Sequence, residues 1–290
     1  MLPPEILDQI FSFLTTDKAS LKACSSAHPV FCHIIQPYLF ADVTISSIGD
    51  NGSFQTKELL TLLSENPHVS NYILHLKISI PEPSHHVAVL NTISTILHLP
   101  VRLTSISFIH QSYARSRILW NELPESFLTA FMTCLRLPSM KTVSLTNIRS
   151  LPLTIFDDFP NIKTIRLINV DVLPHSNWDF DVPQPSLQIL SVFDCEGAEL
   201  PQILFWARTR HLHSLEFRPQ YPIDLSRIII HCRAYFHSLT TLDLDFKGYC
   251  MLNSSMSLTS ADSNTSQSRP LLRLSQARLF RMIVLLSHFI

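Results

Sequence analysis

Glycine is scarce in this chain, with only four among 290 residues, at positions 49, 52, 197 and 248. A phosphate-binding loop or a dinucleotide-binding fingerprint needs several glycines at fixed, short spacing. No two of these four glycines frame either motif. The sequence therefore argues against nucleotide-dependent enzymes of those two classes.

Charged residues are also few, at 16% of the chain, and their signs balance to a formal net charge of -1. No long basic run occurs. Because affinity for nucleic acid depends on clustered lysine and arginine, we expect no nucleic-acid partner.

Six cysteines occur, and no pair is separated by two residues, which is the spacing typical of zinc and redox motifs. The first residues carry Glu5 and Asp8 and no basic segment, so we expect no secretory signal. Reduced, mostly buried thiols and a cytoplasmic or nuclear location are the corresponding expectations.

Groups that could support catalysis or bind a metal are isolated from one another. His211 and His213 would share one face of a predicted strand, but no third metal ligand is evident. Asp243 and Asp245 have no acid, base or nucleophile that can be placed beside them. We therefore expect no metal, no cofactor and no catalytic residue.

Hydrophobic residues make up 46% of the chain, which is enough for a sizeable core in one large or two modest domains. The first helix is predicted within residues 2–14. Pro4 and Glu5 suit its first turn. Its apolar side chains recur at three- and four-residue steps, at Ile6, Leu7, Ile10, Phe11 and Leu14.

Two further short helices are predicted, from Lys18 to about Cys24 and from Ala27 to Phe40. Three short helices in about forty residues lie near the lower limit of what one core can stabilise unaided. A partner protein that completes this core is therefore physically reasonable.

Residues 1–45 resemble an F-box, especially that of fungal F-box proteins. The resemblance rests on Leu2-Pro3-Pro4-Glu5-Ile6-Leu7 with Ile10-Phe11 and Leu14, on Leu21 to Ser25, and on Leu39 to Val43. The chain departs from the family at Phe31, where a tryptophan is usual.

F-boxes dock onto the small adaptor of Skp–cullin–F-box ubiquitin ligases. The resemblance therefore implies a Skp-type adaptor, and through it a cullin, as partners. It assigns the docking region to Leu2, Pro3, Ile6, Leu7, Ile10 and Leu14. The alternative is that these side chains are only the core of a three-helix cap.

From about residue 72 a repeat of the form apolar-x-x-apolar-x-apolar occurs. The last five copies start 22, 25, 25 and 27 residues apart, within the range of about 20–29 residues of leucine-rich repeats. The seven copies are Ile73, Leu76 and Ile78; Leu103, Ile106 and Phe108; Met140, Val143 and Leu145; Ile162, Ile165 and Leu167; Leu187, Leu190 and Val192; Leu212, Leu215 and Phe217; Leu239, Leu242 and Leu244.

Each copy predicts a short strand of a parallel sheet, with its last two apolar side chains pointing inward. The Asn or Cys turn residue usual in leucine-rich repeats is not found at a constant position, although Asn147, Asn169 and Cys195 hint at one. The predicted fold is thus α/β: a short three-helix F-box followed by a divergent leucine-rich-repeat-like solenoid with a parallel sheet.

The predicted segments are an F-box-like domain (1–45), a linker with a helix at 54–65 (46–71), the repeats (72–250), a flexible low-complexity stretch (251–270) and a C-terminal amphipathic helix (271–290). A helix on the outer face is also predicted within 114–137, interrupted from Asn121 to Pro124. Arg273, Arg278 and Arg281 interrupt the last segment, so we expect no transmembrane span there. It suits either a membrane surface or, as we prefer, a cap on the open end of the solenoid.

Side chains that flank the inward positions should lie on the concave face. Their mixture of charge with a few apolar anchors is typical of a protein-binding surface. The candidates for binding a target protein are Arg166, Ile168, Ile189, Phe193, Glu216 and Arg218. Alternatively, a loop or the C-terminal helix covers the apolar members.

We therefore expect a non-catalytic, substrate-recognition subunit of a ubiquitin ligase, whose F-box docks to the adaptor and whose repeats bind the target. The alternative is an interaction scaffold not linked to ubiquitination. An enzyme hidden in the solenoid or in a membrane-associated tail would need a polar pocket that the sequence does not display.

Overall fold

Three short helices begin the computed structural model, which describes residues 2–46, 52–80, 87–111, 117–157, 159–173, 186–195, 203, 211–218, 239–245 and 271–274. They are α1 (Pro4–Ser12), α2 (Lys18–Ala27) and α3 (Pro29–Phe40), which lie where the sequence predicts helices. Proline opens α1 and α3, where its missing N–H costs nothing. Asp17 caps α2, because its side chain accepts a 3.0 Å hydrogen bond from the Ser20 N–H.

A small core of their own holds the three helices together. Its buried members are Leu7, Phe11, Leu21 and Ile35. Phe31 packs against this core, and its ring meets that of Phe11 edge to face at 5.6 Å between centroids. Phenylalanine therefore fills the position where the resemblance leads us to expect tryptophan.

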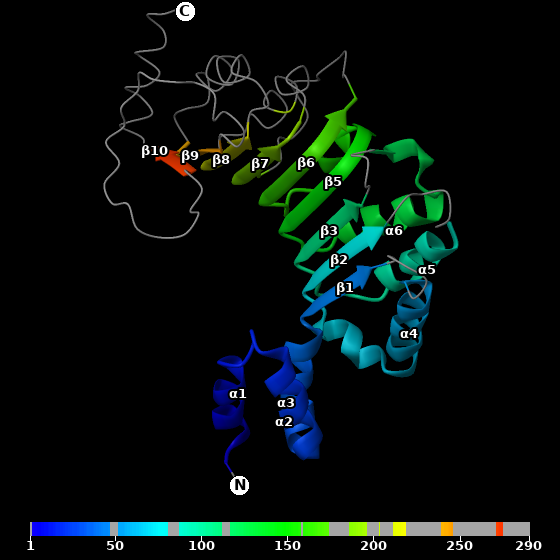
Figure 1. Cartoon of the computed structure of the whole chain (residues 1–290), viewed down its shortest axis with the longest axis vertical. Helices are drawn as coiled ribbons and strands as arrows, with labels where there is room; N and C mark the ends of the chain where they lie inside the picture. The colour runs from blue at the N-terminus through cyan, green and yellow to red at the C-terminus, as the bar shows by residue number, and fades with distance from the viewer. Residues whose placement is uncertain are drawn as a thin grey trace, which may run out of the picture.

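A single mixed sheet organises the rest of the described chain. Nine strands, β1 to β9, pair in parallel, and β10 pairs antiparallel with β9. The spatial order is β1-β2-β3-β5-β6-β7-β8-β9-β10, with β4 beside β5 (Figure 1). The strands are β1 (Asp42–Ser46), β2 (His75–Ile80), β3 (Ser105–His110), β4 (Ile118–Leu119), β5 (Thr142–Leu151), β6 (Thr164–Val172), β7 (Ile189–Phe193), β8 (Ser214–Arg218), β9 (Thr241–Asp245) and β10 (Leu271–Leu274).

The pairing register follows the predicted repeat. The second apolar position of each copy lies beside that of the next strand, as in Val143 opposite Ile165 and Ile165 opposite Leu190. All three apolar positions are buried in each copy from β2 to β8. The prediction that each copy forms a parallel strand with inward apolar side chains is confirmed for these strands.

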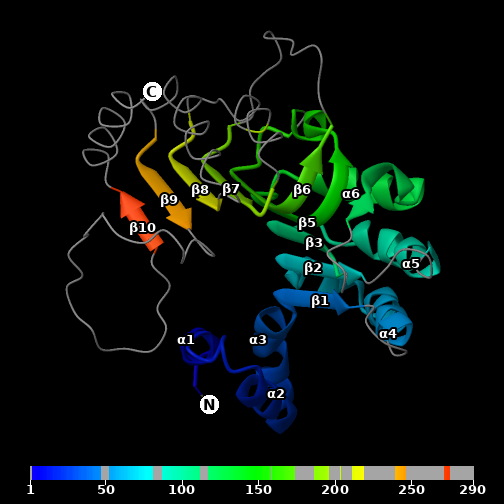
Figure 2. The same ribbon diagram turned by 45° about the horizontal axis from the view of Figure 1, so that its top comes forward.

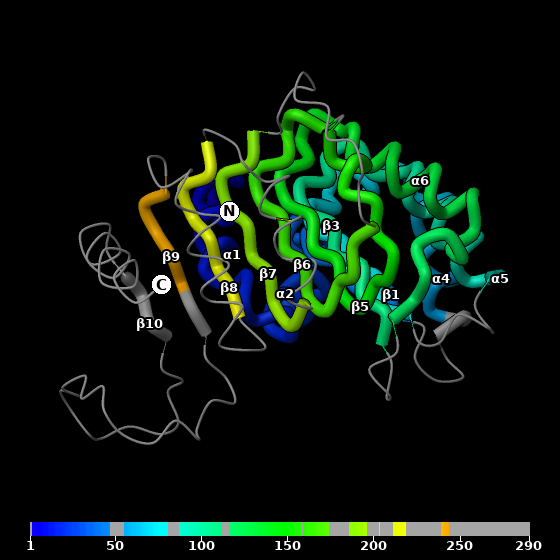
Figure 3. The backbone as a smooth tube through the Cα atoms, turned by 90° about the horizontal axis from the view of Figure 1, so that it is seen from above, coloured from blue at the N-terminus to red at the C-terminus, as the bar shows by residue number. Residues whose placement is uncertain are grey.

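The described helices that follow α3 cover one face of the sheet. They are α4 (Gly52–Glu65), α5 (Val87–Leu97) and α6 (Glu125–Leu135), with short 3-10 turns η1 (Pro67–Tyr72), η3 (Trp120–Glu122) and η4 (Leu153–Phe156). Figures 1 and 3 show α4, α5 and α6 side by side on the convex side of the curved sheet. The opposite, concave face carries the outward side chains of the strands.

The boundary between the helical segment and the sheet differs from the prediction. Residues 42–45, the end of the predicted F-box-like segment, form with Ser46 the edge strand β1 of the sheet, parallel to β2. Phe40, Val43 and Ile45 repeat the apolar-x-x-apolar-x-apolar spacing, and all three pack in or against the main core. An eighth copy of the repeat therefore begins inside the segment that was assigned to the F-box.

Two other segments need correction. Within 114–137, the described residues form β4, η3 and then α6, which begins after Pro124, so the helix is shorter than predicted. The predicted C-terminal helix is wrong for its first four residues, because 271–274 form β10. The remainder of that helix and the low-complexity stretch lie outside the described residues.

A membrane span would need a long, apolar helix, and none of the described helices meets both requirements.

Candidate functional site

Side chains on one side of α1 project away from the helical core. Leu2 is 55% exposed, Ile6 42%, Ile10 45% and Phe13 85%. Ile6 and Ile10, four residues apart, share one side of α1, with Leu2 just before the helix and Phe13 just after it. Folding of this chain alone therefore leaves an apolar row uncovered at its N-terminal end, which we call the α1 row.

The residues predicted to contact an adaptor do not all belong to this row. Pro3 is exposed beside it, and Leu14 is half-buried against the helical core. Leu7 is only 6% exposed, so in this conformation its side chain belongs to the helical core. Its position one residue after Ile6 turns it toward α2 and α3. Phe13, which was not predicted as a contact, is the most exposed of the four.

Polar contacts fix the orientation of α1 against the other helices. The Tyr38 hydroxyl donates a 2.7 Å hydrogen bond to Asp8 Oδ1. Partial burial, and secondarily this carboxylate, raise the pKa of Tyr38 to about 12. Lys18 donates to the backbone carbonyl of Tyr38 and lies 3.7 Å from Asp42. The hydrogen bond of Asp8, on the side of α1 opposite Ile6 and Ile10, thus helps to hold the α1 row outward.

A second candidate surface is the concave face over β6, β7 and β8. All six residues predicted to bind a target lie on it, because the register sets Ile168, Phe193 and Arg218 side by side, with Arg166 and Glu216 one row away. Ile189 begins the same face of β7. The structure therefore brings the predicted set together.

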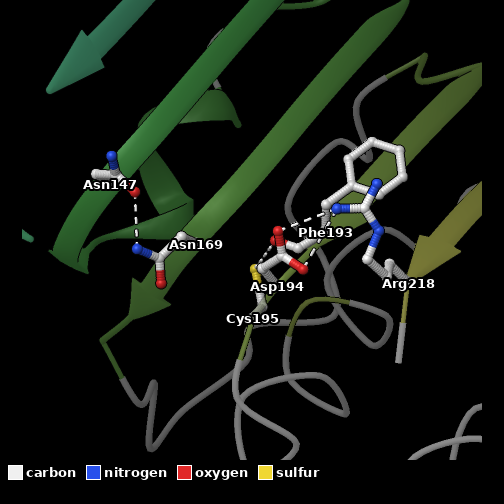
Figure 4. A network of polar contacts seen from close by, with 6 residues as sticks. All are labelled: Asn147, Asn169, Phe193, Asp194, Cys195 and Arg218. Carbon is white, nitrogen blue, oxygen red and sulfur yellow. Dashed lines mark hydrogen bonds and ion pairs between the residues drawn. The ribbon is translucent and has the colours of Figure 1, made fainter. Parts of the chain in front are cut away.

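Phe193 is the centre of this surface but is largely enclosed. It is 9% exposed and lies between two guanidinium groups, that of Arg166 at 5.0 Å and that of Arg218 at 5.2 Å from the ring centroid. Arg218 also pairs with Asp194 at 3.2 Å (Figure 4). Phe193 is therefore covered in this conformation, by arginine side chains from the neighbouring strands rather than by a loop or helix.

The other predicted residues are engaged to different degrees. Glu216 Oε2 accepts a 2.7 Å hydrogen bond from the Ser191 hydroxyl, and Ile168 and Ile189 are half-buried. Arg166 is exposed, and it makes no ion pair with any carboxylate that the structure describes. Of the predicted set, Arg166 is the charged group most open to a partner.

Three polar residues with left-handed backbone, which we call the turn residues, occupy one equivalent position within β5, within β6 and just after β7. Asn147, Asn169 and Asp194 each lie four residues after the second apolar position of their copy, and all three have positive φ, at 60°, 52° and 56°. The equivalent position is Ile80 in β2 and His110 in β3, so the described copies share no constant Asn or Cys there, as the sequence predicts. Cys195 comes one residue after Asp194 and is buried.

These turn residues are linked across the strands. Asn147 Nδ2 donates to the His110 carbonyl at 2.6 Å, and Asn169 Nδ2 donates to Asn147 Oδ1 at 2.7 Å (Figure 4). Arg117 Nε donates to Asn169 Oδ1 at 2.8 Å. We call this chain of hydrogen bonds the Asn ladder. It satisfies polar groups of neighbouring strands and stabilises the part of the sheet that carries the concave face.

Metal and thiol chemistry find little support in the part of the chain that the structure describes. No three His, Cys, Asp or Glu side chains there cluster closely enough to hold a metal ion. His211 and His213 lie just before β8 rather than within it. Burial raises the pKa of the Cys134 thiol to about 12, so this cysteine is suited to packing rather than to nucleophilic chemistry.

No protein-family model matches the chain, and a search of curated proteins returned no significant match.

Proposed function

We propose that this chain is the substrate-recognition subunit of a Skp–cullin–F-box ubiquitin ligase that acts in the cytoplasm or nucleus. Its N-terminal helices would be an F-box that docks to the adaptor, and its strands would be leucine-rich-repeat-like units that bind the target protein. The single observation that carries the proposal is the α1 row, in which Leu2, Ile6 and Ile10 are exposed.

Covering the α1 row would stabilise a complex by a useful amount. Fully burying a leucine or isoleucine side chain contributes about 1.5–3 kcal/mol relative to leaving it exposed. The three half-exposed side chains, with Phe13 beside them, could therefore contribute on the order of a few kcal/mol to docking. Removal of these side chains from water would favour docking, because folding of the chain alone leaves them exposed.

The arrangement of the two surfaces suits a receptor. The helices lie at the β1 end of the sheet, whereas the concave face extends away from them across the strands, from β2 toward β9 (Figure 2). A target held on that face would be kept near the conjugating enzyme that the cullin recruits. The mechanism is an increase in effective concentration, which needs no catalytic residue in this chain.

A pull-down with an immobilised Skp-type adaptor tests the proposal. Ile6→Asp combined with Ile10→Asp should abolish capture, because two charges would have to be buried in the interface. Val101→Asp is the matched control, since Val101 is 57% exposed and lies far along the chain from α1. It should leave capture unchanged.

Circular dichroism spectra of the variants check that all remain folded. Failure of the unmodified chain to bind the adaptor would remove the proposal. Equal loss of capture with Val101→Asp would show that the assay reports nonspecific hydrophobic adsorption rather than docking.

A scaffold not linked to ubiquitination remains the second candidate, and one observation favours it. The N–H groups of Leu74 and His75 donate to the Ala41 carbonyl at 2.9 and 2.8 Å, and Phe40 packs against the main core. The end of α3 is therefore continuous with the sheet. In a scaffold, α1 to α3 would serve only to close the β1 edge.

A further inference from the structure

One row of the concave face carries two cations with hydroxyl groups between them. The register places Lys77 of β2, Ser107 of β3, Ser144 of β5 and Arg166 of β6 in consecutive positions. Lys77 and Arg166 are exposed, and the two serines are half-buried. This segment of the row is therefore polar, accessible and positive.

Negative charge is nearly absent from the same part of the face. Among the described outward positions of β1, β2, β3, β5 and the first half of β6, the one carboxylate is Asp42, which pairs with Lys18 at 3.7 Å. The acidic members of the row, Glu216 and Asp243, lie further on, in β8 and β9. Lys77 and Arg166 thus face solvent without a described carboxylate to neutralise either of them.

Arg166 is held in an orientation that suits anion binding. Its guanidinium lies over the Phe193 ring at 5.0 Å, and the other flanking guanidinium, that of Arg218, is paired with Asp194. A stacked guanidinium keeps the N–H donors of its edge available for a carboxylate. Because the ring restricts its rotamers, binding would cost less conformational entropy than at an unsupported arginine.

The distance between the two cations matches a simple peptide spacing. Lys77 and Arg166 are three strand steps apart, which is about 14 Å at about 4.8 Å per step. An extended peptide advances about 3.3–3.4 Å per residue, so four residues cover the same distance. Two acidic residues separated by three others would therefore reach both cations at once.

We infer that the concave face of β2 to β6 binds an extended acidic segment of a partner polypeptide, with Lys77 and Arg166 each pairing with one carboxylate. Ser107 and Ser144 lie between them to hydrogen-bond the peptide backbone. Ile109 and Ile168, half-buried on the adjacent row, offer apolar contact. The inference rests on the proposed function only in treating that partner as the ligase substrate.

Fluorescence anisotropy with the purified full chain tests it directly. The probe is a short, end-labelled synthetic peptide of Ser, Ala and Thr that carries two glutamates separated by three residues. A second peptide has glutamine at both positions, and a third has the two glutamates adjacent. No adaptor is present, so the result is independent of the pull-down.

The first peptide should bind, and added salt should weaken its binding. Lys77→Gln and Arg166→Gln should each weaken binding about fivefold, as expected for loss of one exposed ion pair, and their combination should weaken it about 25-fold. Lys57→Gln makes the same charge change on α4, on the helical face, and should have no effect. Arg166→Lys should bind less tightly than the unmodified chain, because it keeps the charge but loses the planar fork.

Equal binding of the glutamine peptide would overturn the inference, as would an equal loss with Lys57→Gln. Equal binding of the peptide with adjacent glutamates would overturn the assigned spacing and with it the pairing of two cations. A dissociation constant of about 1 mM is the weakest affinity worth assigning to a docking surface. Absence of binding at about 1 mM protein would therefore also overturn the inference. Adaptor capture without peptide binding would contradict the peptide site but not the ligase proposal. Peptide binding without adaptor capture would contradict the ligase proposal but not the peptide site.

Discussion

At the scale of single residues, a few polar side chains determine how the strands turn. Asn147 and Asn169 adopt left-handed backbone conformations, which asparagine tolerates better than most residues other than glycine. Their amides also form the Asn ladder, which begins at the His110 carbonyl. In a chain with four glycines, asparagine thus takes over a role that glycine often fills.

Replacement of Asn147 should separate these two contributions. Asn147→Gly keeps the left-handed backbone accessible but removes the amide hydrogen bonds, with an expected loss of about 1–3 kcal/mol in the free energy of unfolding. Asn147→Ala should lose about a further 1 kcal/mol, because alanine is strained at φ of 60°. Urea denaturation measures both.

Thr146→Ala is the control for Asn147, because Thr146 is the adjacent, outward residue of β5. It should change the free energy of unfolding by less than either Asn147 variant. Equal losses for Asn147→Gly and Asn147→Ala would contradict the importance of the left-handed backbone at this turn.

At the scale of elements, alternation along each strand decides which face it presents to the helices. In β3, Phe108 points inward and Ile109 outward. The Phe108 ring lies 5.2 Å from that of Phe127 of α6, which in turn stacks on Phe131 at 5.9 Å. Trp120 completes this aromatic cluster at 6.1 Å from Phe131. The cluster attaches α6 to the middle of the sheet.

Phe108→Ala should destabilise the protein by about 3–5 kcal/mol, since it removes a fully buried ring and leaves a cavity under α6. Ile109→Ala, one residue away on the half-buried concave side, should cost about 1 kcal/mol. The midpoints of urea denaturation compare the two. A similar cost for both variants would mean that the two faces of β3 are equally packed.

At the scale of the whole molecule, two cores of unequal size lie on either side of Ala41. The helical core has four buried hydrophobic residues, whereas the core of the sheet extends from Ile45 to Leu242. The link between them is the end of α3, where Phe40 packs against the larger core. A small core with an uncovered apolar row should open more readily than the sheet.

Native-state hydrogen exchange of the full chain should therefore show lower opening free energies for amides of α1 and α2 than for amides of β3, β5 and β6. Adding the adaptor should slow exchange in α1 if the α1 row is a docking surface. Uniform protection from α1 to β6 would instead indicate one cooperative unit and would favour the scaffold alternative. The β3 amides serve as the internal reference, because adaptor binding at α1 should not change their hydrogen exchange.

Much of this architecture was readable from local patterns. The three N-terminal helices follow from proline positions and apolar spacing, and the strands β2, β3 and β5 to β9 follow from the repeat. β1 was missed because Phe40 and Val43 also match the end of the F-box-like motif, so the repeat that they begin with Ile45 was not recognised. α5 was not predicted, although Val89, Leu90, Ile93 and Leu97 give it a buried side at three- and four-residue steps.

The sequence by itself determined the periodic parts of this protein, because burial of an apolar side chain at a regular interval depends on the spacing alone. The tertiary structure decided which side chains remain available to a partner. Leu7 is covered while Ile6 is not, and Phe193 is enclosed while Arg166 is exposed. Such differences depend on side chains that neighbouring helices and strands bring from distant positions, and contacts of that kind cannot be read from the order of residues within one element.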